Sequence, residues 1–356
     1  MSSQFVTLSK NSPEFESYLL GTFSSDKRAL PVQSLNVNSS SETVTFKIVP
    51  LSEVERPPWT VVMVKALKVR SFLLLLVPLF LILTKNIVDR TIRDSLVTVI
   101  STVGLIFGFI SVNLRNDFLD HIKGIDRIFE NSGSRSIQNG WLSAIQVKNF
   151  STLFLILSLV CSVPVIFAFP QVSIVMVVAV GVGLWAQFKK QNSFKYQIGG
   201  EVALFLLFGP LLTIGYQLSM GADYDPESFW LGCVWGWGVL FVVHLKNFKN
   251  ILASSQAGFT NTINWLGFDS ARRFLAFWWL AFVAMNLAYH YFFAGVYWGF
   301  YLSVVVLLVS SSFISKLKNI SSPVGSELRQ VYRHGLTLFL ITIGLWVFEC
   351  LWYLLT

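Results

Sequence analysis

The chain is poor in charged residues and in the residue types that bind most metals or cross-link secreted proteins. Only 13% of its 356 residues are charged, 54% are hydrophobic, and it contains four histidines and three cysteines. This composition excludes an ordinary soluble globular protein and is typical of a polytopic membrane protein. The cysteines lie in apolar runs without metal-ligand spacing, which leaves buried thiols as the simplest interpretation of Cys161, Cys233 and Cys350.

Several signatures of soluble enzymes are also missing. The sequence has no phosphate-binding P-loop, dinucleotide fingerprint, heme signature or Ser-His-Asp order. Residues 1–62 lack a basic segment followed by an apolar run, which excludes a signal peptide. They are polar and serine-rich, and only residues 43–49 alternate as a strand does. We predict a cytoplasmic extension or a partly disordered tail of unassigned role at 1–62, before a transmembrane domain at 63–356.

Long apolar runs dominate the rest of the chain. A transmembrane helix needs about 20 apolar residues, and an all-α bundle of nine transmembrane helices is predicted at 67–86, 95–114, 150–169, 170–187, 200–220, 228–245, 273–290, 293–314 and 335–355. Pro210 predicts a kink in the fifth of these spans. Loops 115–149, 187–200, 246–273 and 315–334 carry sixteen basic residues, against three in the loops of the opposite side. The positive-inside rule therefore places these basic loops and the N-terminus in the cytoplasm.

The most informative stretch is VNLRNDFLDHIKGID, residues 112–126, at the end of the second predicted span. On a helix of about 3.6 residues per turn, four of its oxygen-bearing side chains fall within about 100° of one another. Carboxylates and amides at a membrane surface are costly unless they bind something. Hard oxygen ligands suit Mg²⁺, which usually shares its shell with substrate phosphates. We therefore predict a Mg²⁺ site formed by Asn113, Asn116, Asp117, Asp120 and, after a bend at Gly124, Asp126.

Simpler interpretations of these carboxylates stay open. Asp117 and Asp120 could be solvated caps at a helix end, and Asp126 could be a turn residue after Gly124. Asn113 and Asn116 share the helix face of the first two aspartates, which favours the metal interpretation.

Three ordered segments resemble the UbiA-type intramembrane prenyltransferase family. The first is Asn113-x-x-Asn116-Asp117-x-x-Asp120 followed by Gly124-x-Asp126. The second, from Arg135 to Val147, is similar to the family segment R-P-L-x-S-G-x-[IL]-S-x-x-Q-V. The third combines Lys195-Tyr196 and Gly200-Glu201 with Phe208-Gly209-Pro210. The resemblance covers residues 63–355 and is greatest for the branch that prenylates 1,4-dihydroxy-2-naphthoate in menaquinone synthesis.

The resemblance implies an enzyme of the bacterial inner membrane that moves an isoprenyl chain from a polyprenyl diphosphate to an aromatic acceptor, with Mg²⁺. Membrane lipid would surround its apolar walls, and no nucleic acid is expected as a partner. The implied catalytic residues are Asp117, Asp120, Arg135 and Lys249. The implied substrate-binding residues are Asn113, Asn116, Lys195, Tyr196, Lys246, Asn247, Asn250 and Ser254. Arg135 and Lys195 could instead be positive-inside anchors, and Tyr196 an interfacial aromatic residue.

The second aspartate motif of the family is altered in this chain. The family pattern N-x-R-D-x-x-x-D-x-x-x-G-x-x-T-L aligns with residues 247–262, and Gly258 fixes the register. Asn250 and Ser254 then stand in place of the two aspartates. At an effective dielectric near 20, a unit-charge pair at roughly 4 Å is worth about 4 kcal/mol, and losing about 3 kcal/mol weakens binding roughly 100-fold. Either the bound diphosphate supplies the missing charge, or Lys246 and Lys249 neutralise the diphosphate directly.

Two other functions stay open. A chain with one altered motif could bind prenyl diphosphates or quinones without turnover. A lipid transporter is the other alternative, although transporters place their polar sites near the midplane and the polar groups here lie at helix ends. Asn286 and Glu349 lie inside apolar segments, and we expect them to make polar contacts within the bundle.

Overall fold

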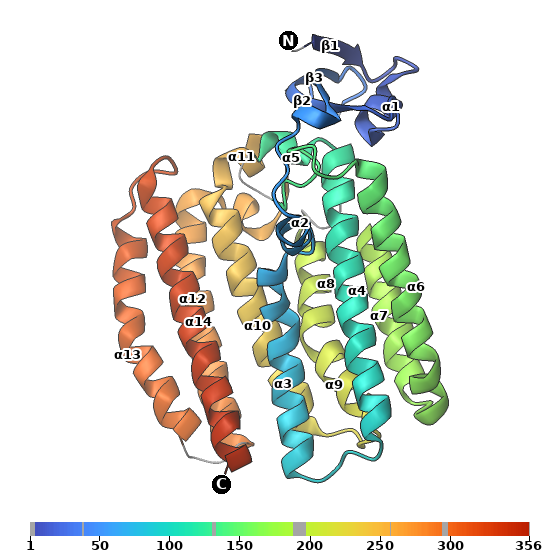
Figure 1. Ribbon diagram of the computed structural model, residues 1–356. Coiled ribbons are helices and arrows are strands. Elements are labelled where there is room, and N and C mark those ends of the chain that lie inside the picture. Colours follow the sequence, from blue (N-terminus) through green and yellow to red (C-terminus); the bar gives the residue numbers. More distant parts are fainter. Residues whose placement is uncertain are drawn as a thin grey trace. The chain divides into compact units, whose positions relative to one another are not determined.

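The computed structural model describes residues 4–37, 39–129, 133–187, 197–256, 258–293 and 298–355 (Figure 1). It divides into two compact units, which are treated separately below. Unit 1 contains residues 1–72 and 103–162, and unit 2 contains residues 73–102 and 163–356. The N-terminal segment thus belongs to the same unit as the region that carries the first aspartate motif.

The predicted all-α membrane bundle is confirmed for the transmembrane part of the chain. Eight helical spans in the described ranges are long and apolar enough to cross a membrane: Val69–Val88, Ser95–Ile122, Ala144–Ala168, Ile198–Ser219, Pro226–Lys249, Thr262–Phe292, Gly299–Asn319 and Ser326–Leu355. A further apolar helix, α7 (Val172–Gln187), is shorter. Eight spans and one shorter helix are consistent with the nine predicted, and several helices continue past the predicted ends into polar residues, as α14 (Ser326–Leu355) does.

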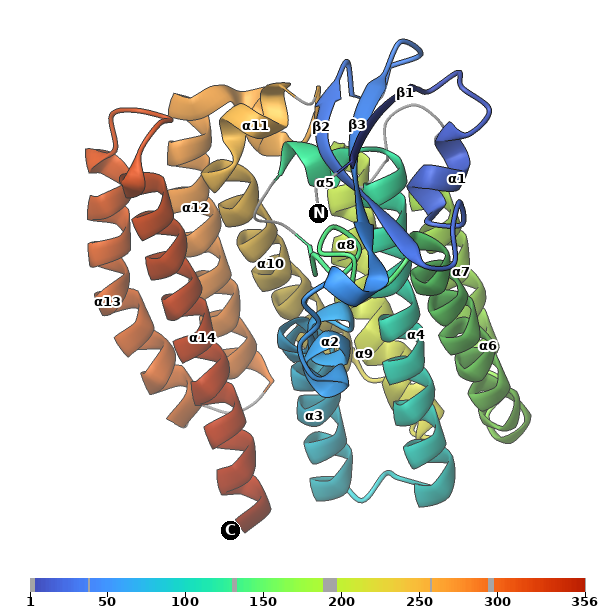
Figure 2. The same cartoon turned by 45° about the horizontal axis from the view of Figure 1, so that its top comes forward.

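Unit 1 begins with a small antiparallel sheet of strand order β1-β3-β2, which Figure 2 shows from another direction. Its strands are β1 (Gln4–Ser9), β2 (Lys27–Leu35) and β3 (Thr43–Pro50). Alternate residues Val44, Phe46 and Ile48 of β3 are buried against Phe15 and Leu19 of α1 (Phe15–Leu20). The predicted strand at 43–49 is therefore confirmed as β3. The alternative of a partly disordered tail is wrong for this described segment, which has a core of its own.

The helices of unit 1 are α2 (Trp59–Ala66), the C-terminal part of α4 (Ser95–Ile122), α5 (Ile125–Ile128) and α6 (Ala144–Ala168). Apolar residues of α2, α4 and the segment before α6 form one buried cluster around Leu114 and Trp141. The helices α4 and α6 approach closely, because Gly104 and Gly108 face Ser158 and reciprocal hydrogen bonds join Ser111 to Ser151. This packing fixes the helix that carries the first motif.

Unit 2 is built around α10 (Pro226–Lys249), the most buried of the eight spans. The helices α3 (Leu73–Val88), α8 (Ile198–Phe208), α9 (Pro210–Ser219), α12 (Thr262–Phe292) and α14 pack against it, and α13 (Trp298–Asn319) packs on α12 and α14. The kink predicted at Pro210 separates α8 from α9. A Cβ atom at Gly209 would lie 2.7 Å from the Gly232 carbonyl oxygen, so glycine allows α10 to approach this kink.

Candidate functional site

The first aspartate motif lies on α4 and on the turn that follows it. Asn113, Asn116, Asp117 and Asp120 are on α4, and Gly124, with a φ of 73°, turns the chain into α5, which carries Asp126. Asp117 and Asp126 are each only 4% exposed. A Cβ atom at Gly133 would be 3.4 Å from Asp126 Oδ1 and 3.6 Å from Asp117 Oδ1. These two oxygens are thus within about 7 Å of each other.

Asp117 has spare coordinating capacity in this buried position. Lys68, which follows α2 with a φ of 54°, forms an ion pair with Asp117 Oδ1. Neither carboxylate oxygen of Asp117 accepts a hydrogen bond from the described part of the chain. Buried carboxylate oxygens normally have such donors, so the free lone pairs of Asp117 suit a hard cation.

Burial and the neighbouring carboxylates raise the cost of ionising Asp126. Burial and the negative charges of Asp120 and Asp117 raise the pKa of Asp126 to about 7. Lys68 and a hydrogen bond from Gln138, 2.5 Å long, act in the opposite direction. This cluster therefore contains three carboxylates, Asp117, Asp120 and Asp126, and one ammonium group, that of Lys68. Within the described ranges, no three His, Cys, Asp or Glu side chains cluster closely enough to hold a metal alone, so a cation here needs amide, water or substrate oxygens as well.

Arg135 supports the backbone of this motif. Its guanidinium donates a hydrogen bond to the Asp126 carbonyl oxygen at 3.0 Å, and its own φ of 58° is in the left-handed region. Part of the donor capacity of Arg135 is therefore used to fix the loop that carries Asp126, while a guanidinium has five N–H donors in total.

The N-terminal sheet binds the motif loop through contacts that sequence analysis did not find. Arg127 of α5 forms an ion pair with Glu42, and the two side chains are 6% and 2% exposed. His121 Nε2 lies 3.0 Å from the Leu19 carbonyl oxygen. A Cβ atom at Gly124 would be 2.6 Å from a methyl group of Val37. Figure 2 shows α5 beside the sheet, in agreement with the α5–β2 contacts.

The second motif lies in unit 2, where α10 ends. Lys246, Asn247 and Lys249 are on the last turn of α10, Asn250 follows it, and α11 (Ile251–Gln256) carries Ser254. Ser254 is 2% exposed, whereas the Lys246 side chain is exposed. The ammonium of Lys249 lies 4.5 Å from the ring centre of Tyr332, a cation–π contact.

Glu201 adds a buried carboxylate beside this motif. The N–H of Thr262, at the start of α12, lies 3.3 Å from Glu201 Oε1, and the Thr262 hydroxyl also bonds Glu201. His244 Nδ1 is 3.6 Å from the same oxygen, within an aromatic environment formed by Phe274 and Trp278. The predicted residues Lys195 and Tyr196 lie outside the described residues. No sequence motif links His244 to Glu201, so their proximity is apparent only from the fold.

A profile of the UbiA prenyltransferase family matches residues 69–352. The chain belongs to this family. The fold is similar to that of a structure solved for work on digeranylgeranylglyceryl phosphate synthase in membranes, with 16% identity, a TM-score of 0.56, and coverage of 81% of this chain and 97% of the other. It is also similar to a UbiA homologue from Archaeoglobus fulgidus bound to GPP and Mg²⁺, with 15% identity, a TM-score of 0.51, and coverage of 80% and 99%. No curated protein sequence matches the chain.

Membership of the UbiA family agrees with the apolar helical spans, and the chain is an integral membrane protein. The matched region begins at residue 69. The N-terminal sheet therefore lies outside the family region, although it contacts the loop that carries the first motif.

Proposed function

We propose that this chain is a Mg²⁺-dependent prenyltransferase that moves an isoprenyl chain from a polyprenyl diphosphate to an aromatic acceptor. The observation that carries the proposal is the buried carboxylate of Asp117, which is paired with Lys68, accepts no hydrogen bond recorded among the described residues and lies near Asp126. The UbiA homologue of similar fold was solved with GPP and Mg²⁺, which supports the same ligand class here. The resemblance of the motifs favours a dihydroxynaphthoate acceptor and a menaquinone pathway in a bacterial inner membrane, with the motif loops in the cytoplasm.

In this proposal the metal is held by the first motif. Its ligands would come from Asn113, Asn116, Asp117, Asp120 and Asp126. When bound, Mg²⁺ supplies positive charge that stabilises the departing diphosphate. Lys68, which is paired with Asp117, adds a permanent positive charge to the same cluster. Arg135 donates a hydrogen bond to the Asp126 backbone. Its remaining N–H groups would bind the diphosphate.

The second motif would bind substrate with neutral and basic groups. Lys195, Lys246 and Lys249 would neutralise part of the diphosphate charge. The remaining proposed contacts are Tyr196, Asn247, Asn250 and Ser254. In the transfer itself, the bond between the isoprenyl carbon and the diphosphate oxygen breaks. A new bond forms to an acceptor ring carbon, which then loses its proton. Apolar helix walls would keep water from the allylic cation.

One observation favours a second candidate, a family member that binds prenyl diphosphate without turnover. Ser254, which replaces an aspartate of the family pattern, is 2% exposed and carries no charge. A buried neutral hydroxyl is a weaker Mg²⁺ ligand than a carboxylate. The two candidates differ in one measurable outcome. A prenyltransferase releases diphosphate from the prenyl donor, whereas a binding protein binds the donor and releases none.

Diphosphate release by the purified protein in lipid tests both candidates. The donor is geranylgeranyl diphosphate, the acceptor dihydroxynaphthoate, and Mg²⁺ is titrated. Asp117→Asn should reduce Mg²⁺-dependent release at least 100-fold, since it removes a charge worth about 3–4 kcal/mol at contact distance. Asp269→Asn is the matched control, because Asp269 has a side chain that is 78% exposed. Equal release by Asp117→Asn and Asp269→Asn would contradict the metal assignment.

A further inference from the structure

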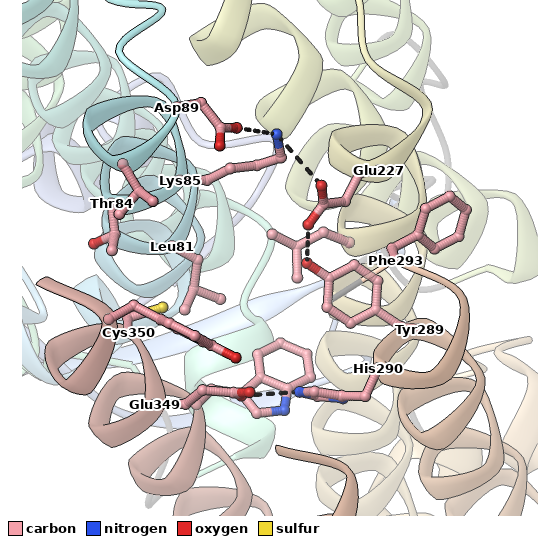
Figure 3. A pocket seen from close by; sticks show the side chains of 14 residues that line it. Leu81, Thr84, Lys85, Asp89, Glu227, Tyr289, His290, Phe293, Glu349 and Cys350 are labelled. Carbon is pink, nitrogen blue, oxygen red and sulfur yellow. Dashed lines mark hydrogen bonds and ion pairs between the residues drawn. The ribbon is translucent and has the colours of Figure 1, made fainter. Parts of the chain in front are cut away.

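Unit 2 contains a cavity of about 260 Å³ at the end of α10 that is remote from the second motif (Figure 3). It is lined by the C-terminal turns of α3, α12 and α14 and by the N-terminal turns of α10. Glu227 marks this end of α10 and Lys249 the other. At about 1.5 Å per residue, these two residues are roughly 33 Å apart along the helix. The cavity is therefore separate from the second motif.

The rim of the cavity is acidic. The ammonium of Lys85 lies 2.7 Å from Asp89, 2.9 Å from Asp225 and 3.3 Å from Glu227. Lys85 donates a hydrogen bond to Asp89, and its ammonium forms ion pairs with Asp225 and Glu227 as well. Asp89 and Glu227 line the cavity, and Asp225 lies beside it as the third partner of Lys85. Together these three ionised carboxylates and one ammonium have a net charge of −2. Such a rim repels anionic ligands, including phosphates and carboxylates.

A neutral pair of side chains lies deeper in the same cavity (Figure 3). His290 Nδ1 is 2.8 Å from the Asn286 carbonyl oxygen, which can only accept a hydrogen bond, so Nδ1 carries a hydrogen. His290 Nε2 is 2.9 Å from Glu349 Oε2. A hydrogen between these atoms belongs either to the histidine or to the acid, and in both cases the pair has no net charge. Glu349 Oε1 also accepts a hydrogen bond from the Gly299 N–H at 3.1 Å.

One buried donor in the wall lacks a partner. Trp346 lines the cavity and is 5% exposed, and its indole N–H has no acceptor within the part of the chain that the structure describes. An indole N–H can only donate, and a buried donor without an acceptor is unfavourable. The indole nitrogen itself is covered in this structure, so a ligand with an acceptor oxygen satisfies it by displacing the side chains that cover this part of the wall.

A second, apolar cavity adjoins the first. It has a volume of about 460 Å³ and shares Tyr289 and Phe293 with the polar cavity. The Tyr289 hydroxyl donates to Glu227 at 3.1 Å, which fixes the side chain between the two spaces. Trp230 and Phe292 line the apolar cavity and are 46% and 72% exposed, so in a membrane protein this space faces lipid.

We propose that these adjoining cavities bind an uncharged hydroxylated ring that carries an apolar chain, a phenol or quinol of the membrane. The hydroxyl oxygen accepts from the Trp346 N–H. Its hydrogen is available to a carboxylate of the lining such as Glu227, whose oxygens contact Tyr289 and Lys85 and have further lone pairs. The ring lies among aromatic and aliphatic walls, and the chain occupies the apolar cavity. A hydroxyl is preferred because it both accepts and donates, whereas an anion is repelled by the rim. This proposal does not rest on prenyl transfer by the first motif.

Binding of three naphthalene probes to the full-length protein tests the proposal. Calorimetric titration in detergent micelles, with empty micelles subtracted, compares 1-naphthol, naphthalene and 1-naphthoate. 1-Naphthol should bind about tenfold more tightly than naphthalene, because only the hydroxyl satisfies the indole N–H, and 1-naphthoate should bind more weakly than both. The proposal would be overturned if the unmodified protein bound 1-naphthol and naphthalene equally, or bound 1-naphthoate more tightly than 1-naphthol.

Two tryptophan variants locate the site. Trp346→Phe keeps the aromatic bulk and removes the N–H donor, so it should weaken 1-naphthol binding about tenfold and leave naphthalene binding unchanged. Trp265→Phe is the matched control, because Trp265 is 74% exposed and lies at the other end of α12. It should bind all three probes as the unmodified protein does. Unchanged 1-naphthol binding by Trp346→Phe would refute the assignment of the donor.

Discussion

The buried ion pair between Glu42 and Arg127 predicts that the N-terminal sheet stabilises the first aspartate motif. The two side chains are 2% and 6% exposed, and Arg127 directly follows Asp126 in α5. Removing one partner of a buried ion pair typically costs about 3–5 kcal/mol, because the other charge stays buried without compensation. We expect Glu42→Gln to destabilise unit 1 by about this amount and to weaken Mg²⁺ binding by the motif.

Hydrogen exchange of the full-length protein in lipid nanodiscs measures this effect locally. Glu42→Gln should lower the protection of amides in β3 and α5, whereas the double variant Glu42→Gln/Arg127→Met should recover most of it because no charge stays buried. Glu53→Gln, at an exposed glutamate after β3, is the control. If Glu42→Gln and Glu53→Gln gave the same protection and the same Mg²⁺ requirement, the link between the sheet and the motif would be refuted.

Three further predictions concern single residues. Lys68→Met should raise the affinity for Mg²⁺ measured without diphosphate, because the ammonium and the metal compete for Asp117; a lower affinity in a Mg²⁺ titration would contradict this. Gly124→Ala should lower Mg²⁺ affinity, since a left-handed φ costs a residue with a Cβ about 1–2 kcal/mol and the new methyl meets Val37; unchanged affinity would speak against it. Burial alone would raise the pKa of Asp225, but hydrogen bonds from an ammonium and from the start of α10 hold this pKa below its usual value. Its stabilising effect is therefore complete above the unfolded pKa, near 3.9, and is lost as the pH falls below it. Asp225→Asn, which keeps a capping oxygen, should make the melting temperature less dependent on pH in that acidic range, and an unchanged pH profile would refute the assignment.

The transmembrane helices and the first motif were predictable because their signals are local. A long apolar run specifies a membrane helix by its length, and the positions of Asn113, Asn116, Asp117 and Asp120 place them together on any helix. Strand β3 was predicted for the same reason, since its buried residues alternate. Strand β2 was not, because it contains Pro31 and an irregular register between Pro31 and Gln33.

The rest of the candidate site depends on contacts between residues far apart in the sequence. Lys68 precedes Asp117 by 49 positions, and no periodicity links them. Asn286 and Glu349 were expected to make polar contacts, and they do, with Ser303 and His290. Which residues they contact depends on how α12, α13 and α14 pack against one another, and the sequence does not specify this locally. The roles assigned to the motif residues stay predictions that the experiments above address.

The most direct test of the central claim is the detection of a prenylated naphthoate by mass spectrometry. The unmodified protein in lipid is incubated with geranylgeranyl diphosphate and dihydroxynaphthoate, with and without Mg²⁺. The proposed activity predicts one new product that carries the isoprenyl chain, formed only with Mg²⁺ and in equal amount to the released diphosphate. Tight binding of the donor with no product and no diphosphate, across several aromatic acceptors, would contradict it and would identify the chain as a binding protein of the family.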